Sequence, residues 1–288
     1  MTTMDAMSRE LSLALVQHDA AKTVDDFGRD LRLLTRQYPA TSLFVFPEQH
    51  LLGDWDPWDP ASTERHAEPL DGQLCRAVSA LARELGVWVV PGSILERTDD
   101  GRIHNTMVVF APTGELVAAY RKAFPWRPVE TTEPGREFVT LPVGQGIVGL
   151  TVCYDAWFPE VSRQLSWMGA ELLLNVVLTP TADRAQEVVL VQANAIVNQV
   201  FVASVNAATP RGQGRSLLVD PQGRILAAAV GAEPTVLAAT IDLDEVGRTR
   251  RHGTAGVTRP WSPFTETDVP IELPVYGGRI DPAPWTPQ

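Results

Sequence analysis

IVGLTVCYDAWFPE, residues 147–160, places a cysteine at the boundary between two kinds of structure. The apolar run at its start predicts a strand that ends at Cys153, and the residues from Phe158 onward are typical of a helix. A side chain at such a boundary lies at the edge of a sheet, where the helix N-terminus supplies positive potential and lowers the pKa of a thiol. Cys153 therefore has two interpretations, a nucleophile or an ordinary buried residue, since free cysteines are usually buried.

The sequence on either side alternates short apolar runs with amphipathic stretches. We expect Asp71 to cap the helix that follows it and Gly86 to end that helix. The turns PTG at 112–114 and DPQG at 220–223 predict two antiparallel hairpins, so the sheets are not purely parallel. This pattern favours a layered α/β (α+β) domain. Strands are expected at 11–17, 42–46, 87–95, 105–110, 116–120, 147–153, 171–178, 201–206 and 236–243, and helices at 24–37, 71–85, 158–169 and 183–198.

Charged side chains follow two other predicted strands. Glu48 ends the run FVFPE, and Lys122 and Glu130 lie in the segment YRKAFPWRPVE. Catalytic carboxylates often lie where a strand meets a loop, and a lysine held in a loop rich in proline and aromatic residues is suited to stabilise an oxyanion. Each of these residues, taken alone, also fits a solvated charge on the surface.

Composition narrows the classes of function. The 288 residues carry a formal net charge of −11 and the pI is about 4.9, so the chain repels nucleic acid phosphates. The five histidines form no metal-binding spacing, and we expect neither a metal nor another cofactor. Two widely spaced cysteines indicate a reducing compartment. We expect a cytoplasmic protein, because we find neither a signal-peptide pattern nor a membrane-spanning apolar stretch.

The composition changes after Thr254. Residues 255–288 are rich in proline and have little periodicity, yet they include apolar side chains such as Trp261 and Phe264. A purely disordered tail is usually less apolar. We therefore expect a main domain at 1–254 and a tail at 255–288 that packs either on its own subunit or at a subunit interface.

The three segments together, FVFPE, YRK and TVCYDAWFPE in this order, resemble the nitrilase superfamily of carbon–nitrogen hydrolases. The resemblance implies a Glu–Lys–Cys triad made of Glu48, Lys122 and Cys153, with the N–H of Tyr154 at the oxyanion. It implies a four-layer α-β-β-α sandwich and homo-oligomers built on a dimer through the outer helices. Trp157 is expected, with Tyr154, to help position the substrate at an aromatic-lined pocket.

The loop KAFPWRPVE, residues 122–130, is similar to the K-x-x-P-W-x-P-x-E signature of aliphatic amidases and formamidases. That branch implies that Glu130 positions the substrate amide. Two departures bear on the substrate: Tyr154 follows the cysteine where that branch has Asp or His, and residues 193–198 lack the Arg and Glu of the superfamily's RAxEN helix. The elbow CYDAWFPE is closer to other amidase and carbamoyl-amide branches, and it disfavours nitrile hydrolysis.

The expected activity is hydrolysis of a small amide to a carboxylic acid and ammonia through a thioester on the cysteine. The alternatives are hydrolysis of N-carbamoyl amides and acyl transfer to an acceptor other than water. A catalytically silent interaction protein is the alternative of another class. The expected partner is a small-molecule amide, with neither nucleic acid nor membrane.

Overall fold

Two β-sheets form the centre of the protein. The structure is a computed structural model that describes residues 9–56, 58–273 and 275–280. One sheet has the strand order β13-β1-β2-β3-β5-β4, with β6 paired to β5, and the other has the order β12-β11-β10-β9-β8-β7. The strands of the first sheet are β1 (Glu10–Gln17), β2 (Leu43–Val45), β3 (Trp88–Val90), β4 (Ser93–Arg97), β5 (Ile103–Phe110), β6 (Leu116–Arg121) and β13 (Thr235–Asp242). Those of the second are β7 (Thr140–Val143), β8 (Gly146–Val152), β9 (Leu172–Val177), β10 (Phe201–Asn206), β11 (Leu217–Val219) and β12 (Ile225–Ala228).

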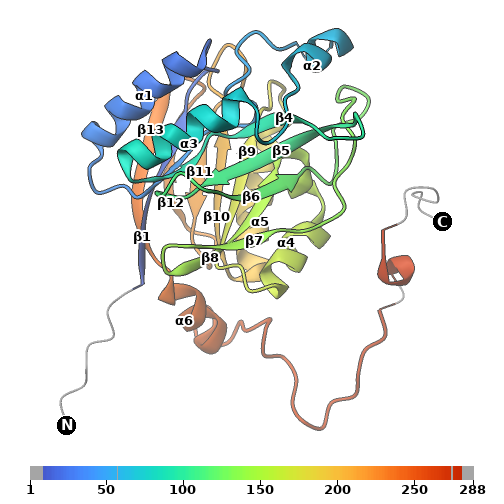
Figure 1. Ribbon diagram of the computed structural model, residues 1–288. Coiled ribbons are helices and arrows are strands. Elements are labelled where there is room, and N and C mark those ends of the chain that lie inside the picture. Colours follow the sequence, from blue (N-terminus) through green and yellow to red (C-terminus); the bar gives the residue numbers. More distant parts are fainter. Residues whose placement is uncertain (1–8, 57, 274, 281–288) are drawn as a thin grey trace.

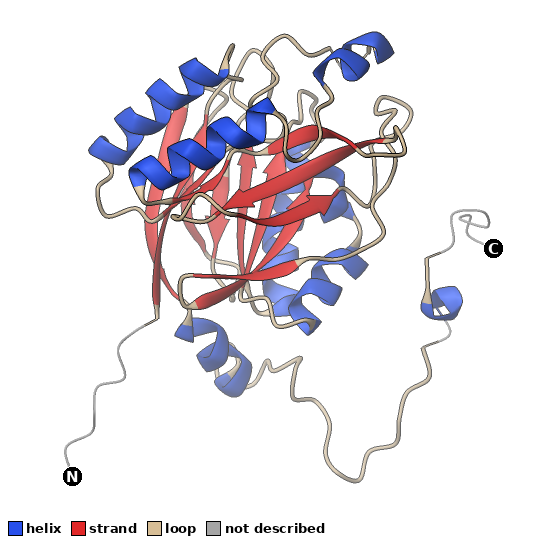
Figure 2. Cartoon of the chain, in the orientation of Figure 1, coloured by secondary structure: helices blue, strands red, loops and turns tan. Residues whose placement is uncertain are grey.

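Helices cover the outer faces of both sheets, as Figure 2 shows. Helices α1 (Val24–Gln37) and α3 (Gln73–Leu85) pack on the first sheet, and α4 (Pro159–Trp167) and α5 (Arg184–Asn198) pack on the second. The inner faces of the sheets meet in a core of aliphatic side chains, which includes Leu13, Val45, Met107, Leu150 and Leu174. This arrangement confirms the expected four-layer α-β-β-α sandwich.

The core follows from the period of two along each strand. In β5, Met107 and Val109 contribute to the core between the sheets, whereas Val108 and Phe110 contribute to the core beneath the helices. Every residue of β5 is buried, because the strand is covered on both faces. Asn105 shares the parity of Met107, so its side chain faces the space between the sheets at the end of the strand.

Several expected boundaries need correction. Residues 87–95 form two strands, β3 and β4, which lie on either side of β5, because the chain turns at Gly92 with φ +95°. Gly72, and not Asp71, caps α3, while Gly86 ends that helix in the left-handed conformation as expected. The sequence interpretation did not include β7, the short helix α2 (Pro60–His66) or the helix α6 (Asp244–His252).

The segment after α6 leaves the body of the protein (Figure 1). Trp261 contacts residues of three helices. The guanidinium groups of Arg163 and Arg250 lie 4.7 and 4.8 Å from the centre of its ring, and its Nε1 donates to the Asn198 carbonyl over 2.8 Å. Tyr276, in the short 3-10 helix η2 (Val275–Gly278), donates to Glu160 over 2.7 Å. No helix in the described ranges is both long and apolar enough to cross a bilayer.

Candidate active site

Three strand ends meet at one edge of the sandwich. β2 leads to Glu48, β6 leads to Lys122, and β8 leads to Cys153, the first residue of the 3-10 helix η1 (Cys153–Trp157). The N–H of Lys122 donates to the carbonyl of Asn105 over 2.8 Å, which continues the pairing of β5 with β6. The pairing of β5 with β6 therefore places Asn105 and Lys122 next to each other at this edge.

Lys122 lies between two carboxylates. Its Nζ donates to Glu130 Oε2 over 2.8 Å and to Glu48 Oε1 over 3.1 Å. All three side chains are buried, with exposed fractions of 1%, 8% and 3%. An ammonium has three N–H groups, so one donor is left for a bound molecule.

Asn105 joins the same two carboxylates from the sheet. Its Nδ2 donates to Glu48 Oε1 over 2.8 Å and to Glu130 Oε1 over 2.9 Å. Glu48 Oε2 accepts the N–H of Leu178 over 2.8 Å, and the N–H of Trp126 donates to Glu130 Oε2 over 2.6 Å. Because Glu48 Oε1 takes two donors and Oε2 takes one, Oε2 is the Glu48 oxygen with room for a proton.

Asp155 connects the cysteine segment to the lysine loop. Its Oδ2 accepts the Tyr120 hydroxyl over 2.8 Å and the N–H of Val152 over 3.0 Å, and its Oδ1 accepts the N–H of Phe124 over 2.9 Å. The side chain is completely buried, and burial raises its pKa to about 6. One carboxylate thereby holds the two segments that carry Lys122 and Cys153.

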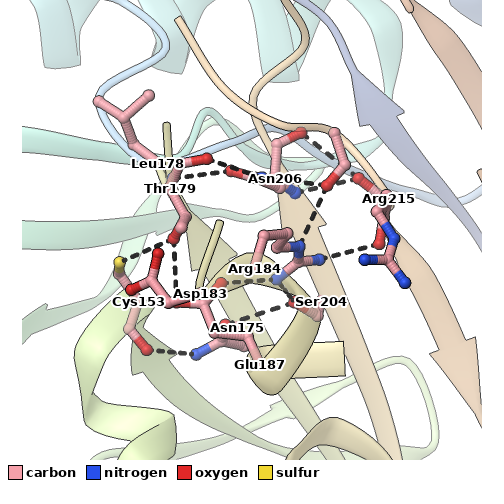
Figure 3. A network of polar contacts seen from close by, with 12 residues as sticks. Cys153, Asn175, Leu178, Thr179, Asp183, Arg184, Glu187, Ser204, Asn206 and Arg215 are labelled. Carbon is pink, nitrogen blue, oxygen red and sulfur yellow. Dashed lines mark hydrogen bonds and ion pairs between the residues drawn. The ribbon is translucent and has the colours of Figure 1, made fainter. Parts of the chain in front are cut away.

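Cys153 has a left-handed backbone conformation with φ 48°, which is uncommon for a residue with a side chain and typical of a strained functional turn. Its Sγ lies 3.8 Å from Thr179 Oγ1, and the Thr179 hydroxyl lies 2.9 Å from Glu187 Oε1 (Figure 3). Arg184 Nη1 in turn donates to Glu187 Oε2 over 3.1 Å. A second line of polar side chains therefore reaches the sulfur from α5.

All three side-chain nitrogens of Arg184 donate hydrogen bonds. It is buried and donates to the Ser204 hydroxyl over 3.1 Å and to the Arg215 carbonyl over 3.0 Å (Figure 3). It also donates to the Gly214 carbonyl over 3.1 Å. A guanidinium with this many partners has little freedom to move. Arg184 thereby fixes Glu187, and through it the hydroxyl next to the sulfur.

Burial and the neighbouring charges set the protonation of the site. Burial and, to a smaller extent, Glu48 raise the pKa of the Cys153 thiol well above its usual value, which is opposite to the lowering expected from the helix terminus. Burial also raises the pKa of Glu48, whereas Lys122 overcomes the effect of burial and lowers the pKa of Glu130. The carboxylates outweigh burial at Lys122, whose pKa lies well above its usual value. The resting site therefore holds a thiol, an ammonium and an ionised Glu130.

A cavity of about 320 Å³ opens onto this cluster. Glu48, Lys122, Glu130 and Cys153 all line it, together with residues from the loops around them. The other lining residues are Gln49, Trp55, Asp56, Trp58, Trp126, Val129, Leu178, Pro180 and Arg211. The cavity wall is therefore aromatic, as expected, with Trp55, Trp58 and Trp126 on it.

The two aromatic residues expected to position substrate lie to one side of this cavity. Tyr154 borders a small hollow next to Cys153, and its ring packs edge-on against Phe158. The indole Nε1 of Trp157 donates to Glu187 over 3.5 Å. The described residues that line the main cavity include neither Tyr154 nor Trp157, so only four of the six predicted residues meet there: Glu48, Lys122, Glu130 and Cys153.

The comparisons with known proteins agree with this geometry. The model of the carbon-nitrogen hydrolase family matches residues 7–251. The chain belongs to the carbon-nitrogen hydrolase family. As a member, it is an enzyme that acts on carbon–nitrogen bonds other than peptide bonds.

Two relatives of this carbon-nitrogen hydrolase are named as amidases. Over 201 residues it is 32% identical to omega-amidase NIT2 of Xenopus tropicalis, covering 64% of this chain and 72% of that protein. Over 217 residues it is 35% identical to deaminated glutathione amidase of Rattus norvegicus, covering 67% of this chain and 65% of that protein.

Solved structures share the fold. Nit3 of Saccharomyces cerevisiae, a member of the nitrilase superfamily, aligns with a TM-score of 0.76 at 24% identity, covering 84% of this chain and 94% of that one. A mutant amidase from Nesterenkonia sp. AN1, in which acrylamide has added to the active-site cysteine, aligns with a TM-score of 0.72 at 25% identity, covering 83% of this chain and 96% of that one.

Sequence reasoning missed several polar residues of the site. Asn105 is the polar residue that opens the run NTMVVF, and its parity with Met107 is the signal that places it between the sheets. Asp155 lies two residues after the cysteine, and a carboxylate inside the predicted turn between strand and helix is the signal that indicates it. Arg211 at the main cavity and Thr179 at the small hollow beside Cys153 carry no sequence signal, because only the packing of distant loops brings them there.

Proposed function

We propose that this carbon-nitrogen hydrolase is an amidase that converts a small carboxamide to a carboxylic acid and ammonia through a thioester on Cys153. The observation that supports the proposal most is the shared cavity, in which one thiol faces a lysine held between two buried carboxylates. Amide cleavage needs a nucleophile, a group that moves protons and a donor for the oxyanion, and this set supplies all three.

In the first half-reaction, Glu48 takes the thiol proton as the sulfur attacks the amide carbon. Lys122 and the N–H of Tyr154 stabilise the negative oxygen of the tetrahedral intermediate. The carbon–nitrogen bond then breaks, and the proton on Glu48 goes to the departing nitrogen, so that ammonia leaves and the acyl group stays on sulfur. Burial raises the pKa of Glu48, which supports this role because a carboxylate with a raised pKa is a stronger base than an ordinary one.

In the second half-reaction, Glu48 removes a proton from water, which attacks the thioester carbonyl. The intermediate collapses to the carboxylic acid, and the proton returns to the sulfur. Glu130, which stays ionised beside Lys122, is suited to accept a hydrogen bond from the amide NH₂ of the substrate. Two carboxylates whose pKa values are shifted in opposite directions are typical of a divided task.

Cys153→Ala tests this mechanism, with Cys75→Ser as the matched control. Cys75 is buried in α3 away from the cavity, where burial raises its pKa to about 12. We expect Cys153→Ala to abolish ammonia release with an unchanged far-UV circular dichroism spectrum, and Cys75→Ser to keep full activity. Added hydroxylamine should divert wild-type product to a hydroxamate. Normal amide hydrolysis by Cys153→Ala would refute the mechanism.

A set of test substrates should distinguish amide hydrolysis from N-carbamoyl hydrolysis and from acyl transfer. Short aliphatic amides and formamide report hydrolysis, and carbon dioxide release from N-carbamoyl amino acids reports the carbamoyl alternative. Product analysis with added amine acceptors reports acyl transfer. A protein that turns over none of these, and whose Cys153 reacts with no thiol probe, would be a silent interaction protein.

We also propose a homo-oligomer that works in a reducing compartment such as the cytoplasm. The outer helices support a homo-oligomer, because large exposed apolar side chains often mark interfaces. Trp167 on α4 is 75% exposed and Val189 on α5 is 63% exposed. Cys75 and Cys153 support a reducing compartment, because both are free thiols. Sedimentation velocity tests the assembly: a monomer at micromolar concentration would exclude it.

A further inference from the structure

A buried ion pair on α5 lies close to Cys153 but outside the main cavity. Arg184 and Glu187 are 1% and 5% exposed, and Arg184 Nη1 lies 3.1 Å from Glu187 Oε2. The described residues that line the main cavity include neither of them. A buried ion pair often adds little to stability, because both charges lose their water. Its place next to a nucleophile therefore calls for an explanation in terms of the chemistry.

One line of contacts leads from this pair to the sulfur (Figure 3). Glu187 Oε1 accepts the Thr179 hydroxyl over 2.9 Å, and the oxygen of that hydroxyl lies 3.8 Å from Cys153 Sγ. Because the hydroxyl gives its proton to the carboxylate, it presents a lone pair to the sulfur. The indole Nε1 of Trp157 donates to the same Oε1 over 3.5 Å. Trp157, which was expected at the substrate, therefore contacts the carboxylate behind the nucleophile.

A second line leads to the backbone of the cysteine (Figure 3). Arg184 Nη1 donates to the Ser204 hydroxyl over 3.1 Å, and that hydroxyl donates to Asn175 Oδ1 over 3.5 Å. Asn175 Nδ2 donates to the Cys153 carbonyl over 3.4 Å. Cys153 has φ 48°, a conformation that persists only where the surroundings hold it. The same guanidinium is therefore linked to the carbonyl of the strained residue and, through Glu187, to its sulfur.

The two charges of the pair act on the thiol in opposite directions. Glu187 is among the carboxylates that, after burial, raise the pKa of Cys153. Burial lowers the pKa of Arg184, whereas Glu187 and Cys153 raise it, so a thiolate and the guanidinium stabilise each other. The other charged groups around the sulfur are Glu48, Lys122, Glu130 and Arg211 at the main cavity, Asp183 at the small hollow and Asp155 in η1.

From these contacts we propose that Arg184 and Glu187 form a positioning pair for the nucleophile. Through Thr179 and Asn175 the pair holds Cys153 in place, and its two opposite charges set the reactivity of the sulfur from outside the main cavity. The inference rests on the role of Cys153 proposed above. It predicts that removing one charge changes the reactivity of the thiol in one direction and that removing the other changes it in the opposite direction.

Three variants test the pair: Glu187→Gln, Arg184→Met and the double variant, each with Cys75→Ser so that Cys153 is the thiol that reacts. The measurement is the pH midpoint of alkylation by iodoacetamide. We expect Glu187→Gln to lower this midpoint and Arg184→Met to raise it, each by about half a pH unit, which is about a threefold change in rate at a pH below the midpoint. The double variant should lie between the two.

Steady-state kinetics supplies a second measurement. Because neither side chain lines the main cavity, we expect both single variants to lower kcat by at least about threefold and to leave KM little changed. Glu84→Gln is the control, since Glu84 forms an exposed ion pair with Arg32 on the first layer of helices. It removes the same charge far from the sulfur and should keep the wild-type midpoint and kcat.

The outcomes separate this inference from the amidase mechanism. Midpoints equal to that of wild-type protein, or shifts of the same sign in both single variants, would overturn the positioning pair. Should Arg184→Met fail to fold, the double variant still decides, because it leaves no unpaired charge and its midpoint should lie above that of Glu187→Gln. Normal amide hydrolysis by Cys153→Ala would overturn the amidase mechanism instead.

Discussion

Gly92 passes so close to Pro47 that a Cβ on the glycine would lie 1.7 Å from the Pro47 carbonyl oxygen. The contact joins the turn between β3 and β4 to the residue before Glu48. Gly92 also has φ +95°, so it serves both the turn and the close approach. A glycine that takes no part in the proposed chemistry therefore determines where the proposed general base lies.

Gly92→Ala should displace Pro47 and Glu48 together. We expect a stability loss of about 1–3 kcal/mol from overpacking and positive φ, and at least about a tenfold fall in kcat. Gly101→Ala is the control, because Gly101 has φ +82° and open space around it. Urea unfolding and amide turnover measure both effects. If the two variants lose the same stability and Gly92→Ala keeps full kcat, the contact does not position Glu48.

Tyr120→Phe should loosen the link between the lysine loop and the cysteine segment. The change removes the 2.8 Å hydrogen bond to Asp155 and keeps the ring in the core between the sheets. We expect a stability loss of about 1–2 kcal/mol and a lower kcat with KM little changed. Tyr38→Phe, at the end of α1, is the control. A kcat equal to that of wild-type protein would show that this bond is structural only.

Much of the fold could be predicted because the strands are apolar runs bounded by turns. The inner and outer faces of β5 follow from a period of two, and the end of α3 follows from Gly86. Within residues 87–95, Pro91-Gly92 interrupts the apolar run and indicates a turn. The sequence does not indicate that the two halves lie on either side of β5, or that Gly92 approaches Pro47 closely, because both depend on the folded sheet.

The proposed site also contains residues that the sequence indicates and residues that it does not. Glu48, Lys122, Cys153 and Glu130 follow strand ends and form recognisable motifs, so the sequence indicated them. Thr179 follows a strand too, but a threonine there has no characteristic pattern. Its distance to the sulfur depends on how β8 and β9 pair, which is a property of the folded sheet.

Thr179 offers a test of how the thiol is oriented. Its hydroxyl proton goes to Glu187, so its oxygen is free to accept the S–H of Cys153. We expect Thr179→Val to lower kcat and the alkylation rate of Cys153 by about tenfold, because the sulfur loses a partner on this side. Thr179→Ser keeps the hydroxyl and should restore both rates. Equal alkylation rates in the two variants would show that the hydroxyl does not act on the sulfur.

His50 should make the protein sensitive to acid. The centre of its ring lies 4.9 Å from that of the Phe46 ring and 6.0 Å from that of the Phe27 ring. Both ring nitrogens are buried and have no hydrogen-bond partner among the described residues. Burial, with smaller effects of His18 and Arg211, lowers its pKa from 6.5 to about 3. Stability from the neutral ring is therefore present above about pH 6.5 and is lost as the pH falls toward 3, by at most roughly 1.4 kcal/mol per pH unit.

His50→Phe removes this titration, because phenylalanine binds no proton in either state and suits a site walled by two phenylalanines. Urea unfolding at several pH values between 7 and 4 should give a flatter decline for the variant than for wild-type protein, with the difference widening as the pH falls. His252→Gln, at the exposed end of α6, should follow the wild-type curve. Parallel curves for His50→Phe and wild-type protein would mean that His50 is protonated equally in the folded and unfolded chains, and that its burial has no effect on acid stability.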